Sequence, residues 1–416
     1  MYKKKEMEEV IQVFAPPSKS FAHRAIICSK LSDSPCEIKN LGVSSDIKAT
    51  SESMERIREY IESGKDGELV LYPKESGSTL RFLIPISGAL GLSVSFFPEG
   101  RLSQRPLSPL YEELITHGMD ISEEGKVPIE IKGNLGSGEY EIPGNISSQF
   151  VSGLLFALPL LQGDSRIKVK GELQSEGYVD MTRRVLQDFS VKTDLEYIDS
   201  DIIFKIKGNQ RYERKAPYVI EGDYSNGAFL MAGAITGKKP VFVKGLNPDS
   251  IQGDREIVNI LSKFGAEIVT GSDGFVVKPG IPKDENRVFD VSQIPDLVPV
   301  IALLASVTYG KTIIKNAGRL RLKESDRLKT ITKALGDIGG DVEELEDGLV
   351  ITGRKKLKGG KASSQGDHRI AMMLAIASLA AEERVTIENH RVVEKSWSSF
   401  YKDAEPLGIM DNLKLD

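Results

Sequence analysis

The sequence predicts an α/β protein of two domains, each built from three βαβαββ-like repeat units. Three observations lead to this prediction. The chain has 416 residues, and because a domain usually holds about 100 to 200 residues, two or three domains are expected. Its composition, 40% hydrophobic and 28% charged, is that of a globular protein with a sizeable core. A short motif also recurs six times, which indicates a duplicated structural unit.

The recurring motif is a β-like segment that ends in a charged residue followed by Gly or Asn. Its copies read EIKN, FPEG, KVKG, FVKG, IIKN and TIEN, and they end at Asn40, Gly100, Gly171, Gly245, Asn316 and Asn389. Successive end points are 60, 71, 74, 71 and 73 residues apart. Chance alternation of strands and helices is the competing explanation, but the regular intervals favour duplication.

Each unit is predicted to contain two helices and a hairpin. About 20 residues before each motif, a polar turn follows a β-like segment and opens an apolar run of helical length. The six turns are 18–20, 77–79, 147–149, 224–226, 294–296 and 367–369. After the later motifs come a second helix-like run and two β-rich stretches separated by an acidic or glycine turn, as in LSKFGAEIVTGSDGFVVKPG. Six such units form two domains of three.

Charge and cysteine content exclude several classes of function. The 55 Lys and Arg residues against 60 Asp and Glu residues leave a net charge of −5, so there is no bulk positive charge to hold nucleic acid or anionic lipid. Cys28 and Cys36 are too few for a disulfide framework and lack the spacing of a zinc site, which favours a reducing compartment.

No membrane span or secretory signal is expected. The longest apolar stretches, 150–161 and 297–307, are shorter than the roughly 18 residues that a membrane span requires. The first ten residues, MYKKKEMEEV, have no apolar segment behind their charges. The predicted location is therefore the cytoplasm.

Residues suited to binding and catalysis gather at two equivalent points of the unit. The first is the start of the first helix, where free amides and the helix dipole favour anions. It carries Lys19, Ser20, Arg24, Gly77, Arg81, Ser147, Ser148, Gln149, Asp296, His368 and Arg369. The second is the loop after the recurring motif, which carries Arg105, Ser175, Tyr178, Lys323, Glu324, Asp326, Arg327 and Lys395. Each residue alone fits a surface charge, an ion pair or a helix cap, but together they are rich in groups that bind phosphates and carboxylates.

The sequence lacks the familiar nucleotide and metal motifs. It contains no P-loop, dinucleotide fingerprint, nucleophile elbow or His-Glu-x-x-His stretch, and its histidines show no ligand spacing. Cations spread over five loops, with Asp296 and Glu324 as candidates for proton transfer, indicate small substrates that carry phosphate and carboxylate groups.

Seven segments, in this order, make the chain resemble the enolpyruvyl transferases. They are PPSKSFAHR, SGSTLR, SSQFVSGLLFALP, IPDLVPVIALLA, RLKESDRL, GDHRIAM and EKSW. The resemblance covers nearly the whole chain and is strongest to members that act on shikimate 3-phosphate. It implies one domain of residues 1–17 plus 222–416, a second of residues 18–221, and an active site in the cleft between them.

The resemblance also implies the reaction. An enolpyruvyl (carboxyvinyl) group passes from phosphoenolpyruvate to the 5-hydroxyl of shikimate 3-phosphate and phosphate is released, a step of the shikimate pathway to aromatic amino acids. Neither a metal nor an organic cofactor is implied. The expected partners are these two small molecules, without nucleic acid or membrane, and the expected state is a monomer.

The resemblance assigns the candidate residues to the two substrates. Those implied around shikimate 3-phosphate are Lys19, Ser20, Arg24, Ser147, Ser148, Gln149, Ser175, Asp296 and Lys323. Those implied around phosphoenolpyruvate are Lys19, Gly77, Arg105, Gln149, Arg327, Arg369 and Lys395. The implied catalytic residues are Lys19, Asp296 and Glu324. We hypothesise that Asp296 is the base toward the hydroxyl and that Glu324 or Lys19 is the acid toward the methylene carbon.

The sequence departs from the family pattern at three places. The usual Asn-Ala-Gly-Thr stretch reads ESGS at 75–78, a position that is commonly Asn is Arg319, and the late Lys-Thr-Phe-Pro motif reads KSWS at 395–398. Substrate affinity and inhibitor response are the properties expected to change. Because Gly77 is retained, inhibition by glyphosate is expected.

Two alternatives stay open at this point. A UDP-N-acetylglucosamine enolpyruvyl transferase shares the fold and the donor, but it typically carries a Cys near the position of Arg105, where neither cysteine of this chain lies. A non-catalytic binding protein of the same fold is the second alternative. The acidic balance and the presence of Asp296 and Glu324 among the cations argue against it.

Overall fold

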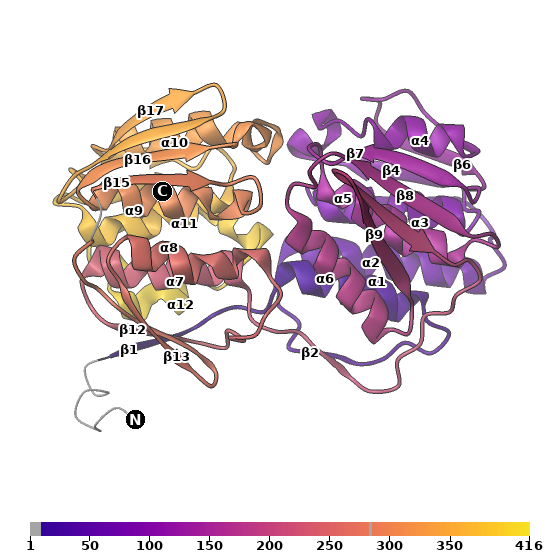
Figure 1. The fold of residues 1–416 in the computed structure, drawn as a ribbon, viewed down its shortest axis with the longest axis horizontal. Coiled ribbons are helices and arrows are strands. Elements are labelled where there is room, and N and C mark those ends of the chain that lie inside the picture. The colour runs from indigo at the N-terminus through magenta and orange to yellow at the C-terminus, as the bar shows by residue number, and fades with distance from the viewer. Residues whose placement is uncertain (1–9, 283–284) are drawn as a thin grey trace. The chain divides into compact units, whose positions relative to one another are not determined.

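The computed structural model describes residues 10–282 and 285–416 and divides the chain into two compact units (Figure 1). The terminal unit comprises Met1–Ser18 and Glu221–Asp416, and the central unit is Lys19–Ile220. Residues 1–9, which carry the secretory-signal prediction and part of the predicted domain 1–17, lie outside the described residues. Among the described residues, no helix combines the length and the apolar character that a membrane crossing requires.

Four complete βαβαββ units occur in the described ranges, as the repeat predicts. In one, two parallel strands are joined by a helix, and after a second helix a hairpin pairs antiparallel with the second strand, so the strand order is β3-β4-β6-β5. Its elements are β3 (Leu69–Lys74), α3 (Gly77–Ala89), β4 (Val94–Pro98), α4 (Leu110–Thr116), β5 (Met119–Ile121) and β6 (Ile129–Gly133).

The other three complete units have the same strand order. They form the sheets β7-β8-β10-β9, β1-β12-β14-β13 and β15-β16-β18-β17. The strands are β7 (Glu139–Pro143), β8 (Ser165–Lys170), β9 (Thr193–Ile198), β10 (Asp201–Ile206), β1 (Ile11–Phe14), β12 (Val241–Lys244), β13 (Glu267–Gly271), β14 (Gly274–Lys278), β15 (Asn286–Asp290), β16 (Gly310–Lys315), β17 (Asp341–Leu345) and β18 (Gly348–Gly353). The helices are α5 (Ser148–Ala157), α6 (Glu176–Asp188), α7 (Tyr224–Gly237), α8 (Ile257–Lys263), α9 (Val298–Val307) and α10 (Arg327–Asp337).

Two further units depart from the predicted pattern because their described residues form no hairpin. In the central unit, the short strand β2 pairs with β11, and α2 leads directly into β3. In the terminal unit, β20 lies between β19 and β21, and all three are parallel. The elements are α1 (Lys19–Leu31), β2 (Ile38–Lys39), α2 (Ser45–Glu62), β11 (Tyr218–Val219), β19 (Gly360–Ser363), α11 (His368–Ala377), β20 (Val385–Glu388), α12 (Phe400–Ala404) and β21 (Leu413–Leu415). The missing hairpin explains why the first interval between motifs, 60 residues, is the shortest.

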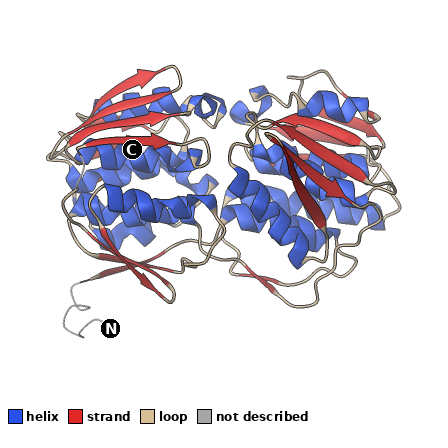
Figure 2. Ribbon diagram, viewed as in Figure 1, coloured by secondary structure: helices blue, strands red, loops and turns tan. Residues whose placement is uncertain are grey.

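The first helix of each unit lies in the interior. In the terminal unit α7, α9 and α11 pack against one another, and Figure 2 shows helices enclosed between sheets of this unit. Every residue of α9 from Val298 to Ser306 is buried. A helix that is apolar on all sides is stable only inside a core. The apolar stretches 150–161 and 297–307 are therefore core segments, one in each unit.

Each recurring motif ends in a residue with left-handed backbone. The φ angle is 56° at Asn40 and Gly100, 70° at Gly171, 82° at Gly245, 59° at Asn316 and 58° at Asn389. Gly adopts this conformation without strain, and Asn tolerates it better than most residues. The turn ends the second strand of the unit and directs the chain into the loop that carries the second set of candidate residues. This backbone requirement explains why each motif ends in either Gly or Asn.

Candidate active site

In the terminal unit, the helices α7, α9 and α11 begin close together. Arg369, the second residue of α11, connects the three starts. Its Nη1 donates to the carbonyl oxygens of Ser225 and Asp296, both at 3.4 Å, and its Nη2 lies 3.0 Å from Asp296 Oδ2. Ser225 lies in the first turn of α7, and Asp296 lies in the 3-10 turn η4 (Pro295–Leu297) that precedes α9. Three of the six predicted helix starts therefore meet at one point.

Arg327 lies at the centre of this group. It is the first residue of α10, and its side chain is 1% exposed. Its guanidinium donates from Nε to Asp367 at 2.9 Å, from Nη1 to Asp296 at 2.9 Å and from Nη2 to Glu324 at 2.6 Å. Burial lowers the pKa of Arg327, but the three carboxylates outweigh burial and hold this pKa above its ordinary value. Such partners are required, because an uncompensated buried charge is strongly destabilising.

Two lysines complete the group. Lys323 Nζ lies 3.5 Å from Asp296 Oδ1. Although 29% of the Lys323 side chain is exposed, its pKa is lowered, chiefly by desolvation; Asp296 opposes this shift and Arg327 adds to it. Lys395, at the end of the 3-10 segment η7 (His390–Lys395), donates to the carbonyl of Gly366 at 3.0 Å. The terminal cluster, as we name it, consists of Asp296, Lys323, Glu324, Arg327, Asp367, Arg369 and Lys395.

Asp254 is a buried carboxyl group beside the terminal cluster. It accepts a hydrogen bond from the hydroxyl of Ser225, whose carbonyl oxygen accepts from Arg369. Burial raises the pKa of Asp254 to about 6, and the charge of Asp296 adds to this shift, whereas Ser225 and Arg369 oppose it. Carboxyl groups with such raised pKa values are frequent at functional sites, although structural networks also produce them.

In the central unit, Lys19 and Asp46 form a largely buried ion pair. Lys19 is the first residue of α1, and Asp46 lies in the first turn of α2. The distance from Lys19 Nζ to Asp46 Oδ2 is 2.7 Å, and the two side chains are 19% and 12% exposed. The pair fixes the lysine ammonium group at the helix start.

Two arginines converge on the first turn of α3. A Cβ atom at Gly77, the first residue of α3, would lie 2.8 Å from Arg81 Nη1 and 3.1 Å from Arg105 Nη1. Arg81 Nη1 also donates to Gln149 Oε1 at 3.0 Å, and Gln149 Nε2 donates to Ser78 Oγ at 3.0 Å. The lack of a side chain at Gly77 lets both guanidinium groups approach the free amides of the helix start. This arrangement suits a carboxylate or a phosphate.

Arg24 and Ser175 lie where α1 meets α6. Arg24 is buried and donates to Thr182 Oγ1 at 2.8 Å, to the Tyr178 carbonyl at 2.8 Å and to the Ser20 carbonyl at 2.7 Å. Burial lowers the pKa of Arg24 to about 10. Ser175, directly before α6, has a φ of 59°. A left-handed residue other than Gly costs free energy and persists only where the surrounding structure determines it, as at many binding sites.

A chain of buried polar groups ties the helix starts of the central unit together. His23 Nδ1 lies 2.7 Å from Thr50 Oγ1, which lies 2.5 Å from Thr79 Oγ1. Thr79 Oγ1 donates to the hydroxyl of Ser76, the N-cap of α3, at 2.7 Å. Because these residues belong to α1, α2 and the start of α3, the hydrogen bonds tie together the helices that begin at Lys19 and Gly77. The central cluster, as we name it, consists of Lys19, Ser20, Arg24, Gly77, Arg81, Arg105, Ser147, Ser148, Gln149 and Ser175.

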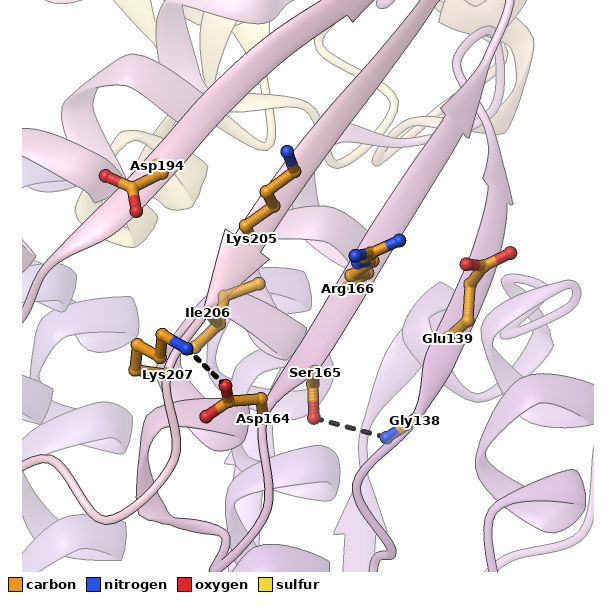
Figure 3. Close-up of a pocket in the computed structure, with 9 residues that line it drawn as sticks. All are labelled: Gly138, Glu139, Asp164, Ser165, Arg166, Asp194, Lys205, Ile206 and Lys207. Atoms are coloured by element: carbon orange, nitrogen blue, oxygen red, sulfur yellow. Dashed lines mark hydrogen bonds and ion pairs between the residues drawn. The ribbon is translucent and has the colours of Figure 1, made fainter.

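A charged depression on the central unit lies apart from both clusters (Figure 3). No residue of either cluster lines it. Its wall carries as many acidic as basic side chains, and Lys207 Nζ lies 2.5 Å from Asp164 Oδ2. The depression therefore has no net charge to attract an anionic substrate. Within residues 10–282 and 285–416, no group of three or more His, Cys, Asp or Glu side chains is placed to hold a metal ion.

Comparison with known proteins identifies the family. The model of the EPSP synthase family (3-phosphoshikimate 1-carboxyvinyltransferase) matches residues 3–403. The chain belongs to the EPSP synthase family. Two curated relatives named 3-phosphoshikimate 1-carboxyvinyltransferase, from Clostridium kluyveri and Clostridium acetobutylicum, are 46% identical over 410 residues and 45% identical over 411 residues. The alignments cover 95% of this chain and of the first relative, and 94% of this chain and of the second.

Solved structures confirm the predicted enolpyruvyl transferase fold. An EPSP synthase from Acinetobacter baumannii has a TM-score of 0.74 at 22% identity, with 96% of each chain covered. The enolpyruvyl transferase NikO from Streptomyces tendae has a TM-score of 0.74 at 15% identity, with 95% of this chain and 94% of that chain covered. At these identities the likeness shows the fold alone. The names of the curated relatives disfavour the UDP-N-acetylglucosamine alternative.

The structure brings the site residues expected from the EPSP synthase family into the two clusters. Five of them, Asp296, Lys323, Glu324, Arg327 and Arg369, are connected through the carboxylate of Asp296 or the guanidinium of Arg327. Lys395 is connected more loosely, through the backbone of Gly366. In the central cluster, Gly77, Arg105 and Gln149 meet at α3, and the hydroxyl of Ser147 caps α5 by accepting from the Gln149 amide at 3.3 Å. Their roles toward the substrates stay predictions.

Sequence reasoning missed Asp254 and two carboxylates that pair with predicted cations. Asp46 looks like an ordinary acidic residue in a first helical turn, and its pairing with Lys19 spans 27 residues. Asp367 is a helix cap, as its position suggested, but it is also a buried partner of Arg327. In both cases the signal visible in the sequence was a helix start, which many acidic residues share.

Two of the three departures from the EPSP synthase pattern contact neighbouring groups in the structure. Arg319 Nη2 donates to the carbonyl of Ser292 at 3.0 Å, and its charge contributes to the lowered pKa of Lys323. The Glu75 carboxylate lies against Gly100, where a Cβ atom would be 2.7 Å from its Oε2.

Proposed function

We propose that this protein transfers the enolpyruvyl group of phosphoenolpyruvate to the 5-hydroxyl of shikimate 3-phosphate and releases phosphate. The observation that carries the proposal is the terminal cluster, where Lys323, Arg327 and Arg369 surround the carboxylate of Asp296 in a chain of the EPSP synthase family. Cations bind the anionic groups of both substrates, and neighbouring carboxylates transfer protons.

In this proposal each substrate contacts residues from both clusters. Shikimate 3-phosphate contacts Lys19, Ser20, Arg24, Ser147, Ser148, Gln149, Ser175, Asp296 and Lys323. Phosphoenolpyruvate contacts Lys19, Gly77, Arg105, Gln149, Arg327, Arg369 and Lys395. The convergence of Arg81 and Arg105 on the amides of α3 supports the second assignment, because such a site matches a carboxylate or phosphate.

The chemistry proceeds by addition and elimination. The methylene carbon of phosphoenolpyruvate gains a proton, and the 5-hydroxyl oxygen attacks the adjacent carbon as its own proton leaves. The tetrahedral adduct then loses a methyl proton and expels phosphate, which restores the vinyl group. Asp296 is the proposed base toward the hydroxyl, and Glu324 or Lys19 is the proposed acid. The guanidinium groups of Arg327 and Arg369 stabilise the charge on the departing phosphate.

The test is a direct assay of purified protein with the two substrates and a chelator, with released phosphate and the enolpyruvyl product measured by mass. We expect Arg369→Lys and Arg105→Lys to lose most of the turnover. Arg287→Lys is the matched control, because Arg287 is a buried arginine of the terminal unit that donates to the carbonyls of Tyr309 at 2.9 Å and Lys263 at 3.3 Å, both of which lie outside the terminal cluster. Turnover of UDP-N-acetylglucosamine alone, or no turnover of either acceptor by folded protein, would reject the proposal.

We also infer that the protein acts as a monomer in the cytoplasm. The two cysteines and the acidic composition support the location. Multi-angle light scattering checks the oligomeric state, and a mass of twice 45.7 kDa would contradict it.

A further inference from the structure

The two places where the chain passes between the units are hydrogen-bonded to each other. The chain leaves the terminal unit after Ser18 and returns to it at Glu221. The Ser18 amide donates to the Glu221 carbonyl at 2.8 Å, and the Asp223 amide donates to the Pro16 carbonyl at 2.8 Å. Together with the antiparallel bridge between Pro17 and Gly222, these bonds hold the outgoing and returning segments side by side.

One side chain, that of Gln252, joins both segments. Its Oε1 accepts from the Ser18 hydroxyl at 3.3 Å and from the Tyr224 amide at 3.2 Å. Its Nε2 donates to the Gly222 carbonyl at 2.7 Å and to Glu221 Oε1 at 2.6 Å. Gln252 is 5% exposed, so all four hydrogen-bonding positions of a buried carboxamide are used.

The partners also determine the orientation of the amide. A backbone N–H only donates and a backbone carbonyl only accepts, so a flipped amide would lose its bonds to both Tyr224 and Gly222. Glu221 is held in turn by Asn247, whose Nδ2 donates to Oε2 at 3.1 Å, and by the Ser250 hydroxyl. The contacts of Gln252 are therefore specific in direction as well as in distance.

We propose that Gln252 is a positioning residue for the transferase reaction, an inference that rests on the proposed function. The segments that it joins lead directly into two helix starts of the site. Lys19 follows Ser18 and begins α1. Asp223 caps α7 by accepting from the Asn226 amide at 2.8 Å, and α7 carries Ser225, whose carbonyl contacts Arg369. By holding both segments, Gln252 sets where each helix starts, and with it the placement of Lys19 and Arg369.

Gln252→Met tests the proposal. Methionine has a similar length but no amide, so all four hydrogen bonds are lost while the side-chain volume is kept. The matched control is Gln210→Met in the central unit. The amide of Gln210 accepts from the Lys192 amide at 2.8 Å and donates to the carbonyls of Lys192 and Lys207 at 3.0 and 2.8 Å, and no residue of either cluster is among these partners.

We expect both variants to lower Tm by a few degrees, because each removes several hydrogen bonds. Gln252→Met lowers kcat/KM by about tenfold or more, with the loss mainly in kcat, whereas Gln210→Met stays within about twofold of the unmodified protein. A Gln252→Met variant that is folded at the assay temperature and also stays within about twofold overturns the proposal.

A second pair of variants covers the case in which Gln252→Met does not fold. Gln252→Glu places a carboxylate against Glu221, and adding Glu221→Gln restores a donor and acceptor pair with the roles exchanged. We expect the double variant to recover part of the activity that the single variant loses. A folded single variant as active as the unmodified protein, or a folded double variant that recovers none of the activity lost by the single variant, overturns the proposal.

Amide hydrogen exchange tests the positioning role of Gln252 independently of the proposed transferase function. In Gln252→Met we expect faster exchange at Ser18 and Tyr224 than in the unmodified protein, and unchanged exchange there in Gln210→Met. If Gln252→Met leaves the exchange at these two amides unchanged, the positioning role is overturned, whatever the activity of the variant. If the unmodified protein does not convert shikimate 3-phosphate and phosphoenolpyruvate, the proposed function fails. The exchange result still decides whether Gln252 holds the two segments.

Discussion

Replacing Asp367 by Asn tests whether the terminal cluster requires the third carboxylate beside Arg327. Oδ2 of Asp367 accepts from Arg327 Nε at 2.9 Å and from the Ser325 hydroxyl at 3.1 Å, and Oδ1 accepts from the Arg369 amide at 3.0 Å. Asparagine keeps the shape and the ability to cap α11. It removes the negative charge beside a guanidinium that is 1% exposed, and with its oxygen in the cap it also replaces the acceptor of Arg327 Nε by an amide donor.

The expected loss follows from the partners that stay in place. Removing one member of a buried ion pair lowers the free energy of unfolding by about 3 to 5 kcal/mol. Arg327 keeps Glu324 and Asp296, so we place the loss for Asp367→Asn near the lower end, at about 3 kcal/mol. Asp367→Ala also removes the helix cap, which adds about 1 kcal/mol.

Urea unfolding followed by tryptophan fluorescence measures this loss. The chain has 1 tryptophan, Trp397, which is buried in the terminal unit and so reports the unit that carries the substitution. Asp337→Asn is the control, because Asp337 forms an exposed pair with Lys333 at 2.9 Å. Such pairs contribute less than about 0.5 kcal/mol. If Asp367→Asn changed stability no more than Asp337→Asn, the claim that Arg327 needs its third carboxylate would be refuted.

Three further outcomes are expected from single substitutions. The pKa of Asp254 is about 6 in the fold, above the unfolded value near 3.9, so ionisation destabilises the fold as pH rises through this window. The effect of Asp254→Asn on the free energy of unfolding should therefore be more favourable at pH 7.5 than at pH 4, by on the order of 3 kcal/mol. Urea titrations that give the same effect at pH 7.5 and pH 4 would contradict this. Gly77→Ala should raise the KM for phosphoenolpyruvate by about tenfold with little change in Tm, because its Cβ displaces the guanidinium groups of Arg81 and Arg105; an unchanged KM argues against that site. Arg24→Lys should lower Tm by about 4 °C, since lysine cannot make the three bonds of the guanidinium, and a Tm equal to that of the unmodified protein would show that those bonds do not stabilise the fold.

The parts of the fold that the sequence predicted depend on local signals. The recurring motif is visible because a left-handed backbone accepts Gly or Asn, and the helix starts are visible because polar caps precede apolar runs. Even here the details shifted. The cap of α3 is Ser76, one residue before the predicted turn at 77–79, and the turn at 294–296 forms a 3-10 turn so that α9 begins at Val298.

The parts that the sequence did not predict depend on contacts between distant segments. The two units without a hairpin were not foreseen, because the later units suggested a pattern that β2 and β20 do not complete. The pairing of Asp367 with Arg327 spans 40 residues, and no local pattern marks it. The candidate site was therefore predictable as a set of residue types at equivalent positions. Which carboxylate holds which cation was not predictable.

The pairing of β1 with β12 has a consequence for how this chain folds during its synthesis. Ile11 lies opposite Val241, so β1 cannot pair with β12 until some 230 further residues have been synthesised. At the usual 5 to 20 residues per second, that delay is on the order of 10 to 50 s, long compared with the folding of a small domain. The central unit is contiguous and emerges during this interval, so it can fold first and shorten the loop that the terminal unit must close. Until then the residues of β1 lack their partner strand, and unpaired strand edges are prone to aggregation.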